Sequence, residues 1–284
     1  MRLLILGGSG MLGHQLWRGL HAQHDTWVTL RRPVADFATH NLFDEAKAIQ
    51  ADDITDDEAL GHALGQAKPE AVINCVGLIK QRAGASDEAL AQRVNAEFPH
   101  RLAKQCSEVG ARLIHFSTDC VFSGTKSNYT EADPPDATDL YGQSKYQGEV
   151  AEAHCVTLRT SVIGHELGTN LALLDWFLSH RGQAVNGFTK AIYSGFTTCE
   201  MSRIVERILI RHREFSGMWH VASKPISKFD LLKLCQDKLG WEGVIVPNDK
   251  FVCDRSLNAD RFNAATGYSP PSWVAMISEL AQQS

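Results

Sequence analysis

The first twenty residues constrain the fold of this chain more than any other stretch. Residues 2–6 form a continuous apolar run, which fits a strand buried on both faces of a parallel sheet. The segment Gly7-Gly8-Ser9-Gly10-Met11-Leu12-Gly13 follows at once, and residues 14–20 then show apolar side chains at helical spacing. The order strand, glycine-rich turn, helix is the one that binds the pyrophosphate of a dinucleotide.

The residues of this turn have separate physical roles in such an arrangement. Gly7 permits the tight turn, Gly10 lets the backbone approach the phosphates, and Gly13 lets the helix pack on the strand. The start of the helix, at Met11 and Leu12, offers free N–H groups and a partial positive charge to the anion. These five residues are predicted cofactor contacts; the alternative is a tight turn that binds no ligand.

Bulk composition places the chain among ordinary globular proteins. It has 284 residues, of which 44% are hydrophobic and 21% charged, enough for one large domain or two unequal ones. The net charge of −5 gives no basic surface for nucleic acid, and no apolar run approaches the length of a membrane span. We therefore expect neither nucleic acid nor a membrane as a partner.

The cysteines and histidines of the sequence bear on the cellular compartment and on metal binding. The seven cysteines show no CxxC pairing, which favours reduced thiols and a cytoplasmic location. The twelve histidines show no zinc-binding spacing, so no metal site is expected. The N-terminal apolar run has no basic region ahead of it, and we interpret it as a first strand, not a signal peptide.

Strands and helices alternate through the first half of the chain. Strands are predicted at residues 27–30, over a short stretch that ends at 53–54, and at 71–76, 111–117 and 155–159, with helices at 58–64, 86–109 and 146–154. With the glycine turn, this order predicts a Rossmann-type, doubly wound parallel α/β sheet. Gly164 closes the last strand, so residues 1–163 are predicted to form an NAD(P)-binding domain and residues 164–284 a smaller α/β substrate-binding domain.

The end of the second strand distinguishes between the two dinucleotide cofactors. An acidic residue there binds the 2′-hydroxyl of NAD, whereas arginine can accommodate the 2′-phosphate of NADP. Here the strand runs into Arg31 and Arg32 without an acidic residue beside them, so NADPH is favoured and NADH is the alternative. If neither cofactor binds here, the two arginines are solvated loop charges.

Two further strand ends are predicted to contact the cofactor. The first would lie beside the adenine, or would instead lead into the N-cap of the next helix. The second ends in small residues that keep the backbone open to a ligand above the sheet. The predicted contacts at these two ends are Asp53, Ile54, Cys75, Val76 and Gly77.

A tyrosine and a lysine four residues apart carry the predicted chemistry. Tyr141 and Lys145 would share one helix face, about 6 Å apart, and an ammonium close to a phenol lowers the pKa of the phenol. The lysine can also reach a ribose hydroxyl, so both residues are predicted cofactor contacts. Thr118 follows the strand at 111–117, at the edge where parallel sheets build ligand sites. The alternative is a Tyr and a Lys on a solvated face.

Six segments spread over nearly the whole chain add a resemblance to these patterns. They are residues 7–13, 116–122, 141–145, 158–161, 217–222 and 255–258. In these segments the chain resembles the extended short-chain dehydrogenases/reductases, and among them most of all the dTDP-4-dehydrorhamnose reductase family. The resemblance implies that Tyr141 is the proton donor, that Lys145 is its partner, and that Thr118 hydrogen-bonds the reacting oxygen.

The same resemblance implies a reaction and a setting. A nicotinamide hydride would reduce the 4-keto group of a nucleotide-activated 6-deoxy sugar, and the product would feed cell-surface polysaccharide synthesis. A homodimer is expected from the superfamily. The resemblance also implies that residues 194–216 return to the nucleotide-binding domain.

The residues after the strand at 111–117 separate this chain from related enzymes. Sugar-nucleotide 4,6-dehydratases carry a glutamate after the aspartate, whereas here Cys120 follows Asp119, so the base for elimination is missing. In the bifunctional GDP-fucose synthase, a cysteine at this offset and a later histidine epimerise the carbon beside the ketone. Cys120 and His165 therefore leave an epimerase–reductase as one alternative, unless Cys120 is a buried apolar residue. A non-catalytic, cofactor-binding regulatory subunit is the other.

The second half of the chain offers candidate substrate contacts. Thr118, Asp119 and Cys120 are expected to face the substrate. Asn170, at the start of a helix predicted over residues 170–179, would touch a substrate phosphate or cap the helix. Arg255 would pair with a substrate diphosphate or lie on the surface. Further helices are predicted at residues 199–211, 228–239 and after 272, and Val162 stands where the reductase family often has tryptophan.

Overall fold

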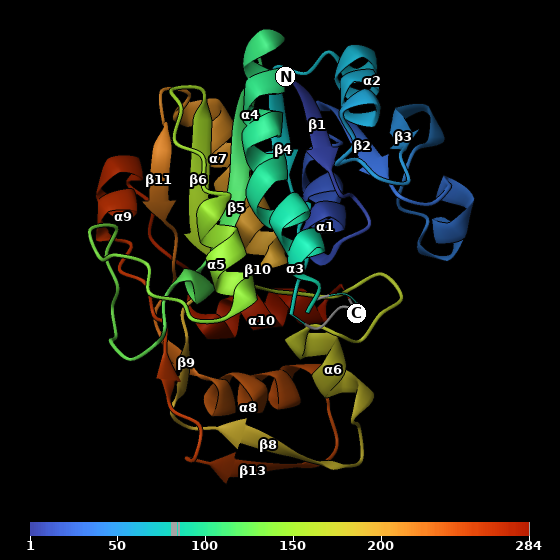
Figure 1. The fold of residues 1–284 in the computed structure, drawn as a ribbon. Helices are drawn as coiled ribbons and strands as arrows, with labels where there is room; N and C mark the ends of the chain where they lie inside the picture. Colours follow the sequence, from blue (N-terminus) through green and yellow to red (C-terminus); the bar gives the residue numbers. More distant parts are fainter. Residues whose placement is uncertain (81–83, 85, 284) are drawn as a thin grey trace.

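A seven-stranded sheet organises the molecule in this computed structural model, which describes residues 1–80, 84 and 86–283 (Figure 1). The strand order is β11-β6-β5-β4-β1-β2-β3, and every pair is parallel. The strands are β1 (Arg2–Leu6), β2 (Asp25–Leu30), β3 (Ala48–Gln50), β4 (Ala71–Asn74), β5 (Arg112–Thr118), β6 (Cys155–Thr160) and β11 (Gly217–His220). The predicted Rossmann-type doubly wound sheet is confirmed.

Helices cover both faces of this sheet because successive residues of its central strands, which point to opposite faces, are mostly apolar. Leu3 and Ile5 of β1 point to one face and pack with α1 (Met11–Leu20) and α7 (Thr198–Arg211). Leu4 and Leu6 point to the other face and pack with α2 (Asp57–Ala67) and α4 (Phe98–Glu108). A strand buried on both faces has no polar side, which is why β1 reads as an unbroken apolar run.

Most of the remaining elements lie at the carboxyl ends of the strands, below the sheet in Figure 1. Strands β12, β9 and β14 form one small sheet, and β13 pairs with β8 in another. The strands here are β7 (Val162–Ile163), β8 (Ala184–Phe188), β9 (Ala191–Tyr193), β10 (Phe196–Thr197), β12 (Ile226–Ser227), β13 (Val244–Asn248) and β14 (Cys253–Asp254). The helices below the sheet are α6 (Leu173–Ser179), α8 (Lys228–Leu239) and α10 (Trp273–Ala281), whereas α9 (Asp260–Thr266) lies beside β11 and α5 (Leu140–Gln147) packs on β5.

Several predicted elements have the bounds that the sequence indicates. Strand β1 spans the predicted residues, and α8 begins after its cap Ser227, whose hydroxyl accepts a hydrogen bond from the Asp230 amide. Helix α8 ends at Gly240, which adopts a left-handed conformation. The apolar stripe predicted for residues 199–211 is fully buried in α7, against α1. In each case the signal is local, so neighbours in the sequence decide the structure.

Three predicted elements are wrong in extent. No strand ends at Asp53, because β3 stops at Gln50 and the Asp53 carboxylate accepts the Thr55 amide in a turn. The helix predicted at residues 146–154 is instead α5, which ends at Gln147. It stops there because Gly148 packs on the backbone of Asn95, where a Cβ would lie 1.9 Å from the carbonyl oxygen.

The helix predicted at residues 170–179 also starts later than expected. It is α6, which begins at Leu173, and Asn170 lies on the exposed chain ahead of it. Ahead of the helix, Glu166 Oε2 accepts the amides of Leu171 and Ala172 at 2.6 and 2.7 Å. The predicted capping role of Asn170 is wrong, because α6 begins three residues later and its N-cap residue, Ala172, supplies no capping side chain.

The helix predicted from residue 86 contains an irregular stretch. It runs as α3 (Glu88–Ala91), then a π-helical segment at Gln92–Glu97, and then α4, with Pro99 in the first turn of α4. Proline fits there because the first turn lacks amide partners in any case. In the part of the chain that the structure describes, no helix is long and apolar enough to cross a bilayer.

Candidate active site

The glycine-rich turn has the geometry that a dinucleotide requires. Gly7 has a φ of +80°, and its amide donates to Thr29 Oγ1 at 3.0 Å. The Gly10 amide donates to the Gly7 carbonyl at 3.1 Å. A Cβ on Gly13 would lie only 2.2 Å from that same carbonyl oxygen, so a side chain there would push the turn open.

The start of α1 is left open to an anion. Gly10 occupies the N-cap position and supplies no capping side chain, and the first turn carries no acidic residue. Among the described residues, no side chain therefore competes for the amides of Met11 and Leu12, where the helix dipole is positive. The turn and the helix start together fit a dinucleotide pyrophosphate.

Two exposed arginines follow β2, as the sequence indicates. Arg32 lies 3.6 Å from the Asp36 carboxylate, and its guanidinium stands 5.0 Å from the centroid of the Phe37 ring. Arg31 is exposed and makes no hydrogen bond or ion pair with a described residue. One guanidinium is thus free to meet a 2′-phosphate, which fits NADP better than NAD.

The other predicted cofactor contacts differ in their surroundings. Partial burial of Asp53 opposes ionisation, but hydrogen bonds from Thr55 and Arg93 outweigh it and lower the pKa of the carboxyl. Ile54 is buried in the core beneath α2. Whether the segment of Asp53 and Ile54 reaches the adenine stays a prediction, since no strand presents it.

The chain after β4 lies directly against the glycine turn. The Val76 side chain is 3.2 Å from the place of a Cβ on Gly7, and the Cys75 backbone is equally close. Gly77 lies beside Asn95, whose amide group both donates to and accepts from the backbone of Leu78. The structure thus brings Cys75, Val76 and Gly77 to the same edge of the sheet as Gly7.

The three predicted catalytic residues also meet at this edge. Thr118 ends β5 and is 6% exposed, and its hydroxyl forms a side-chain hydrogen bond with Tyr141. Tyr141 and Lys145 lie on α5, which Asp139 caps by accepting the Gly142 amide at 2.9 Å. The Lys145 ammonium is buried and donates to the Phe116 carbonyl at 2.7 Å.

The predicted lowering of the Tyr141 pKa is wrong for the ligand-free protein, in which the pKa is raised. Burial raises the pKa of Tyr141, with Cys120 and the carboxylates of Asp119 and Asp139 adding to the rise, whereas the bond with Thr118 opposes it. Burial also lowers the pKa of Lys145 to about 8. The rise in the Tyr141 pKa comes first from burial and then from the neighbouring Cys120, Asp119 and Asp139.

Some of the predicted substrate contacts lie close together after β5, and one does not. Asp119 is 8% exposed and accepts the Thr118 hydroxyl at 3.2 Å. Arg255 reaches the same place from the far end of the chain, with its Nη1 3.4 Å from Cys120 Sγ. Asn170 makes no contact with this group, because it lies on the exposed segment ahead of α6.

The two residues of the epimerase alternative have different surroundings. Burial raises the pKa of the Cys120 thiol to about 12, and the charge of Arg255 offsets this only in part. His165 Nδ1 lies 2.9 Å from Asp175 Oδ1. A thiol with this pKa is protonated at neutral pH and is a poor base.

Two charged residues at the site were not predicted. Lys80 donates to Asp139 Oδ2 at 2.8 Å, and its ammonium stands 5.5 Å from the centroid of the Tyr141 ring. Asp139 had a local signal, since an aspartate just before a helix is a typical N-cap. Lys80 had none, because its partner lies 59 residues away along the chain.

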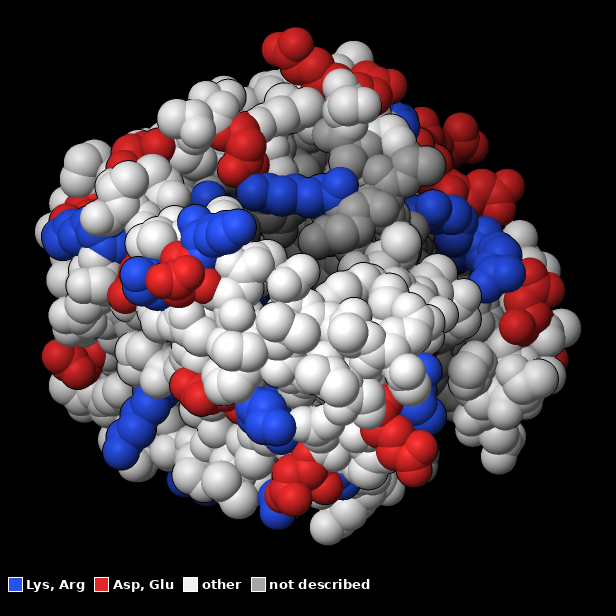
Figure 2. All heavy atoms as spheres, turned by 90° about the horizontal axis from the view of Figure 1, so that it is seen from below, with Lys and Arg blue, Asp and Glu red and all other residues white. Residues whose placement is uncertain are grey.

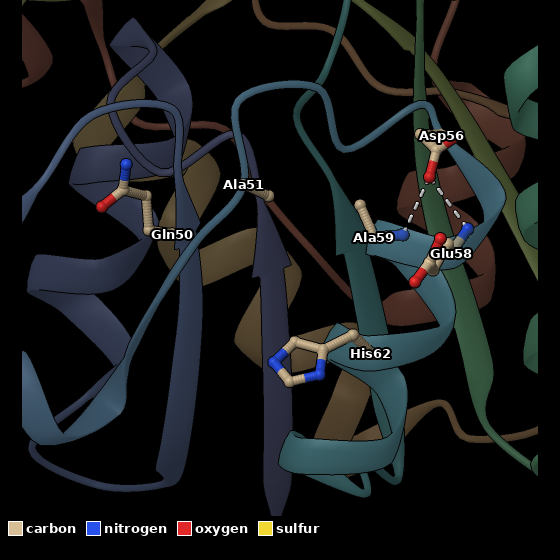
Figure 3. A pocket seen from close by; sticks show the side chains of 6 residues that line it. All are labelled: Gln50, Ala51, Asp56, Glu58, Ala59 and His62. Atoms are coloured by element: carbon tan, nitrogen blue, oxygen red, sulfur yellow. Dashed lines mark hydrogen bonds between the residues drawn. The ribbon is translucent and has the colours of Figure 1, made fainter.

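Two further features of the surface lie outside this site. Seen from the side of the small sheets, basic and acidic residues are scattered around a broad uncharged area (Figure 2). A hollow of about 320 Å³ lies between the end of β3 and the start of α2 (Figure 3). Its Asp56 accepts the amides of Glu58 and Ala59 as the cap of α2, and none of the predicted site residues lines it.

Comparison with known proteins gives the family. The family model described as RmlD substrate binding domain matches residues 1–282. A dTDP-4-dehydrorhamnose reductase of Escherichia coli (strain K12) is 28% identical over 306 aligned positions, covering 100% of this chain and 98% of the relative. One from Burkholderia thailandensis is 35% identical over 175 residues, 60% of this chain and 53% of the relative.

A relative with a different name is similar over about half of the chain. Methionine adenosyltransferase 2 subunit beta of Mus musculus is 32% identical over 154 residues, which is 53% of this chain and 42% of the relative. The chain thus spans about half the length of this protein and of the Burkholderia thailandensis reductase.

Solved structures share the fold. A dTDP-4-dehydrorhamnose reductase from Bacillus anthracis in complex with NADP has a TM-score of 0.79 at 21% identity, covering 100% of this chain and 99% of its own. The Bordetella bronchiseptica enzyme WbmG in complex with NAD and UDP has a TM-score of 0.80 at 22% identity, with coverages of 100% and 94%. By its nearly full-length match, the chain belongs to the RmlD substrate-binding-domain family of extended short-chain dehydrogenases/reductases.

Proposed function

We propose that this protein is an NADPH-dependent reductase of a nucleotide-activated 4-keto-6-deoxy sugar. The observation that carries the proposal is the side-chain hydrogen bond between Thr118 and Tyr141, one helical turn from the buried Lys145. The match to dTDP-4-dehydrorhamnose reductases over the full chain supports the same substrate class. Cell-surface polysaccharide synthesis is the setting that this family implies.

Each residue of the site has a separate role in the proposed reduction of a ketone. The cofactor, when bound, supplies the hydride that adds to the carbonyl carbon. The electron pair of the C=O double bond moves to the oxygen, which takes a proton from the Tyr141 hydroxyl and leaves a phenolate. Thr118 holds the same oxygen by a hydrogen bond, and Lys145 stands one turn away on α5 to return a proton to the tyrosine.

NADPH is the proposed cofactor, with NADH as the alternative. Gly7, Gly10 and Gly13 would receive the pyrophosphate at the start of α1, and Arg31 and Arg32 would meet the 2′-phosphate. Residues 1–163, together with 194–216, form the proposed nucleotide-binding domain, and the rest of residues 164–284 the substrate-binding domain. The packing of α7 on α1 and the pairing of β11 with β6 support a return of the chain to the first domain.

The substrate is proposed to lie over Asp119 and Cys120, with its diphosphate toward Arg255. Arg255 fits this role because its Nε is buried without a hydrogen-bond partner among the described residues. A homodimer in the cytoplasm is part of the proposal. Seven free cysteines fit a reducing compartment, and sedimentation of the purified protein tests the dimer.

Two alternatives remain beside the reductase. The epimerase–reductase is disfavoured by the high pKa of the Cys120 thiol. A regulatory subunit is favoured by the similarity to a methionine adenosyltransferase beta subunit. An intact set of Thr118, Tyr141 and Lys145 supports the reductase, because a protein that only binds the cofactor does not need it.

Loss of NADPH absorbance tests the proposal. The purified protein is given dTDP-, UDP- and GDP-4-keto-6-deoxy sugars made in place by dehydratases, with Tyr141→Phe as the control. Oxidation with one sugar that disappears in Tyr141→Phe would support the reaction, the cofactor and the proton donor together. Binding of NADPH without oxidation by any sugar would favour the regulatory subunit. A Cys120→Ser variant with unchanged product stereochemistry would remove the epimerase.

A further inference from the structure

A cation on the face of the Tyr141 ring comes from outside the helix that carries the tyrosine. Lys80 follows β4 by six residues, and its ammonium is 5.5 Å from the ring centroid. This distance is within the range of about 6 Å over which a cation is attracted to an aromatic face. The ammonium side chain is 35% exposed, so it is only partly screened by water.

Asp139 fixes this ammonium relative to the tyrosine. Its Oδ2 accepts from Lys80 at 2.8 Å, while its Oδ1 accepts the Gly142 amide and so caps α5. Arg255 Nη2 lies 3.9 Å from the same Oδ2. The carboxylate is therefore attached to the first turn of the helix that carries Tyr141, and the lysine is attached to the carboxylate.

The lysine on the same helix does not take this position. The Lys145 ammonium donates to the Phe116 carbonyl, and its pKa of about 8 means that it is partly neutral in mildly alkaline solution. A phenolate formed at Tyr141 needs a positive charge nearby. Among the described residues, Lys80 is the cation that lies over the face of the tyrosine ring.

We propose that Lys80, held in place by Asp139, is a second cation, beside Lys145, that stabilises the phenolate left when Tyr141 gives up its proton. The inference rests on the proton-donor role of Tyr141 in the proposed function. Asp139 is a positioning residue, because it acts through Lys80 and through the cap of α5. Its own negative charge works against the phenolate, so the two members of the pair have opposite effects.

Other charged or titratable groups surround the tyrosine and stay unchanged in the test. They are Asp119 and Cys120 after β5, Arg255 behind Asp139, and Lys145 on α5. The opposite signs expected for Lys80 and Asp139 distinguish an electrostatic role from loss of structure, which would affect both variants alike.

The test measures the ionisation of Tyr141 in the cofactor-free protein. Tyrosines are replaced biosynthetically by a fluorinated tyrosine with a more acidic phenol, and fluorine NMR follows each ring with pH. The Tyr141→Phe protein assigns the resonance. The variants are Lys80→Met, Asp139→Asn, which keeps an oxygen to cap α5, and the two combined.

We expect Lys80→Met to raise the pKa of Tyr141 and Asp139→Asn to lower it, each by about a tenfold change in the ionisation constant. The double variant should lie between them. Lys126→Met is the matched control, because Lys126 pairs with Asp133 and stands 5.8 Å over the ring of Tyr129 instead. It should leave Tyr141 unchanged. Lys80→Arg should restore the original ionisation.

The outcomes separate this inference from the proposed function. Shifts of the same sign in Lys80→Met and Asp139→Asn, or no shift in either, would overturn it. If the shifts are opposite and the wild-type protein reduces a sugar, the pH dependence of kcat/KM should move in the same directions. If the shifts are opposite but no sugar is reduced, the ion pair acts as inferred and the reductase proposal is the one that fails.

Discussion

Substitution of Gly13 by alanine tests whether the cofactor turn is as closely packed as the structure indicates. The added Cβ would lie 2.2 Å from the Gly7 carbonyl oxygen and 3.0 Å from the Gly8 Cα. Ordinary contact begins at 3.4 Å, so the helix and the turn must separate by about 1 Å. The Gly7 carbonyl that moves also accepts the Gly10 amide, so the shift reaches the predicted pyrophosphate cradle.

The magnitude follows from two opposing effects. Overpacking costs about 1–3 kcal/mol, whereas alanine in place of a helical glycine gains about 1 kcal/mol. We expect Gly13→Ala to lower the free energy of unfolding by about 1 kcal/mol and to weaken NADPH binding at least about tenfold. Urea denaturation measures the first quantity, and calorimetric titration with NADPH measures the second.

Gly61→Ala is the matched control for this prediction. Gly61 is also inside a helix, α2, but a Cβ there would meet nothing within 4 Å. The control should gain up to about 1 kcal/mol of stability and bind NADPH as the wild type does. The reasoning is refuted if Gly13→Ala matches Gly61→Ala in both stability and NADPH affinity.

Three further predictions use single buried or exposed groups. Lys145→Met should raise the free energy of unfolding at neutral pH, because burial lowers the lysine pKa to about 8 in the folded state. Between the folded-state pKa of about 8 and the ordinary lysine pKa of 10.5, the unfolded wild-type chain binds more protons than the folded one, so wild-type stability rises with pH. The stability gained by Lys145→Met should therefore shrink over this pH range in urea titrations. A gain that is independent of pH would contradict the lowered pKa of Lys145. Tyr193→Phe should cost no stability in thermal denaturation, because it removes a buried hydroxyl that has no partner among the described residues; a loss of about 2 kcal/mol would mean that the hydroxyl is satisfied. Arg31→Ala should weaken NADPH binding more than NADH binding in parallel titrations, and an equal loss for both would remove the 2′-phosphate contact.

Most of the fold could be predicted from local patterns in the sequence. The apolar run of β1, the cap of α8 at Ser227 and its end at Gly240 could all be predicted, because each depends on residues next to one another. The end of α5 could not, because Gly148 stops the helix by packing on Asn95, more than fifty residues away. Contacts between distant segments leave no mark on the spacing of apolar residues.

The residues of the candidate site likewise fall into those that local patterns predict and those that depend on distant contacts. Thr118, Tyr141 and Lys145 could be found from their positions on one strand end and one helix. Lys80 could not, because its role depends on an ion pair with Asp139 that forms only when the sheet is assembled. The shift in the Tyr141 pKa was predicted with the wrong sign, because the spacing of Tyr141 and Lys145 does not show how deeply the phenol is buried, and burial is the largest cause of the rise.

The π-helical segment at Gln92–Glu97 makes the active site sensitive to the length of a helix that carries none of its catalytic residues. Within it, Asn95 bonds the backbone of Leu78 after β4 and the hydroxyl of Ser144 on α5. Deletion of one residue from the segment would restore regular α-helical turns and rotate what precedes it by about 100°. Asn95 would then face away from both partners. The segment after β4 and helix α5 would lose the side chain that bonds them to each other, while the sheet stayed intact.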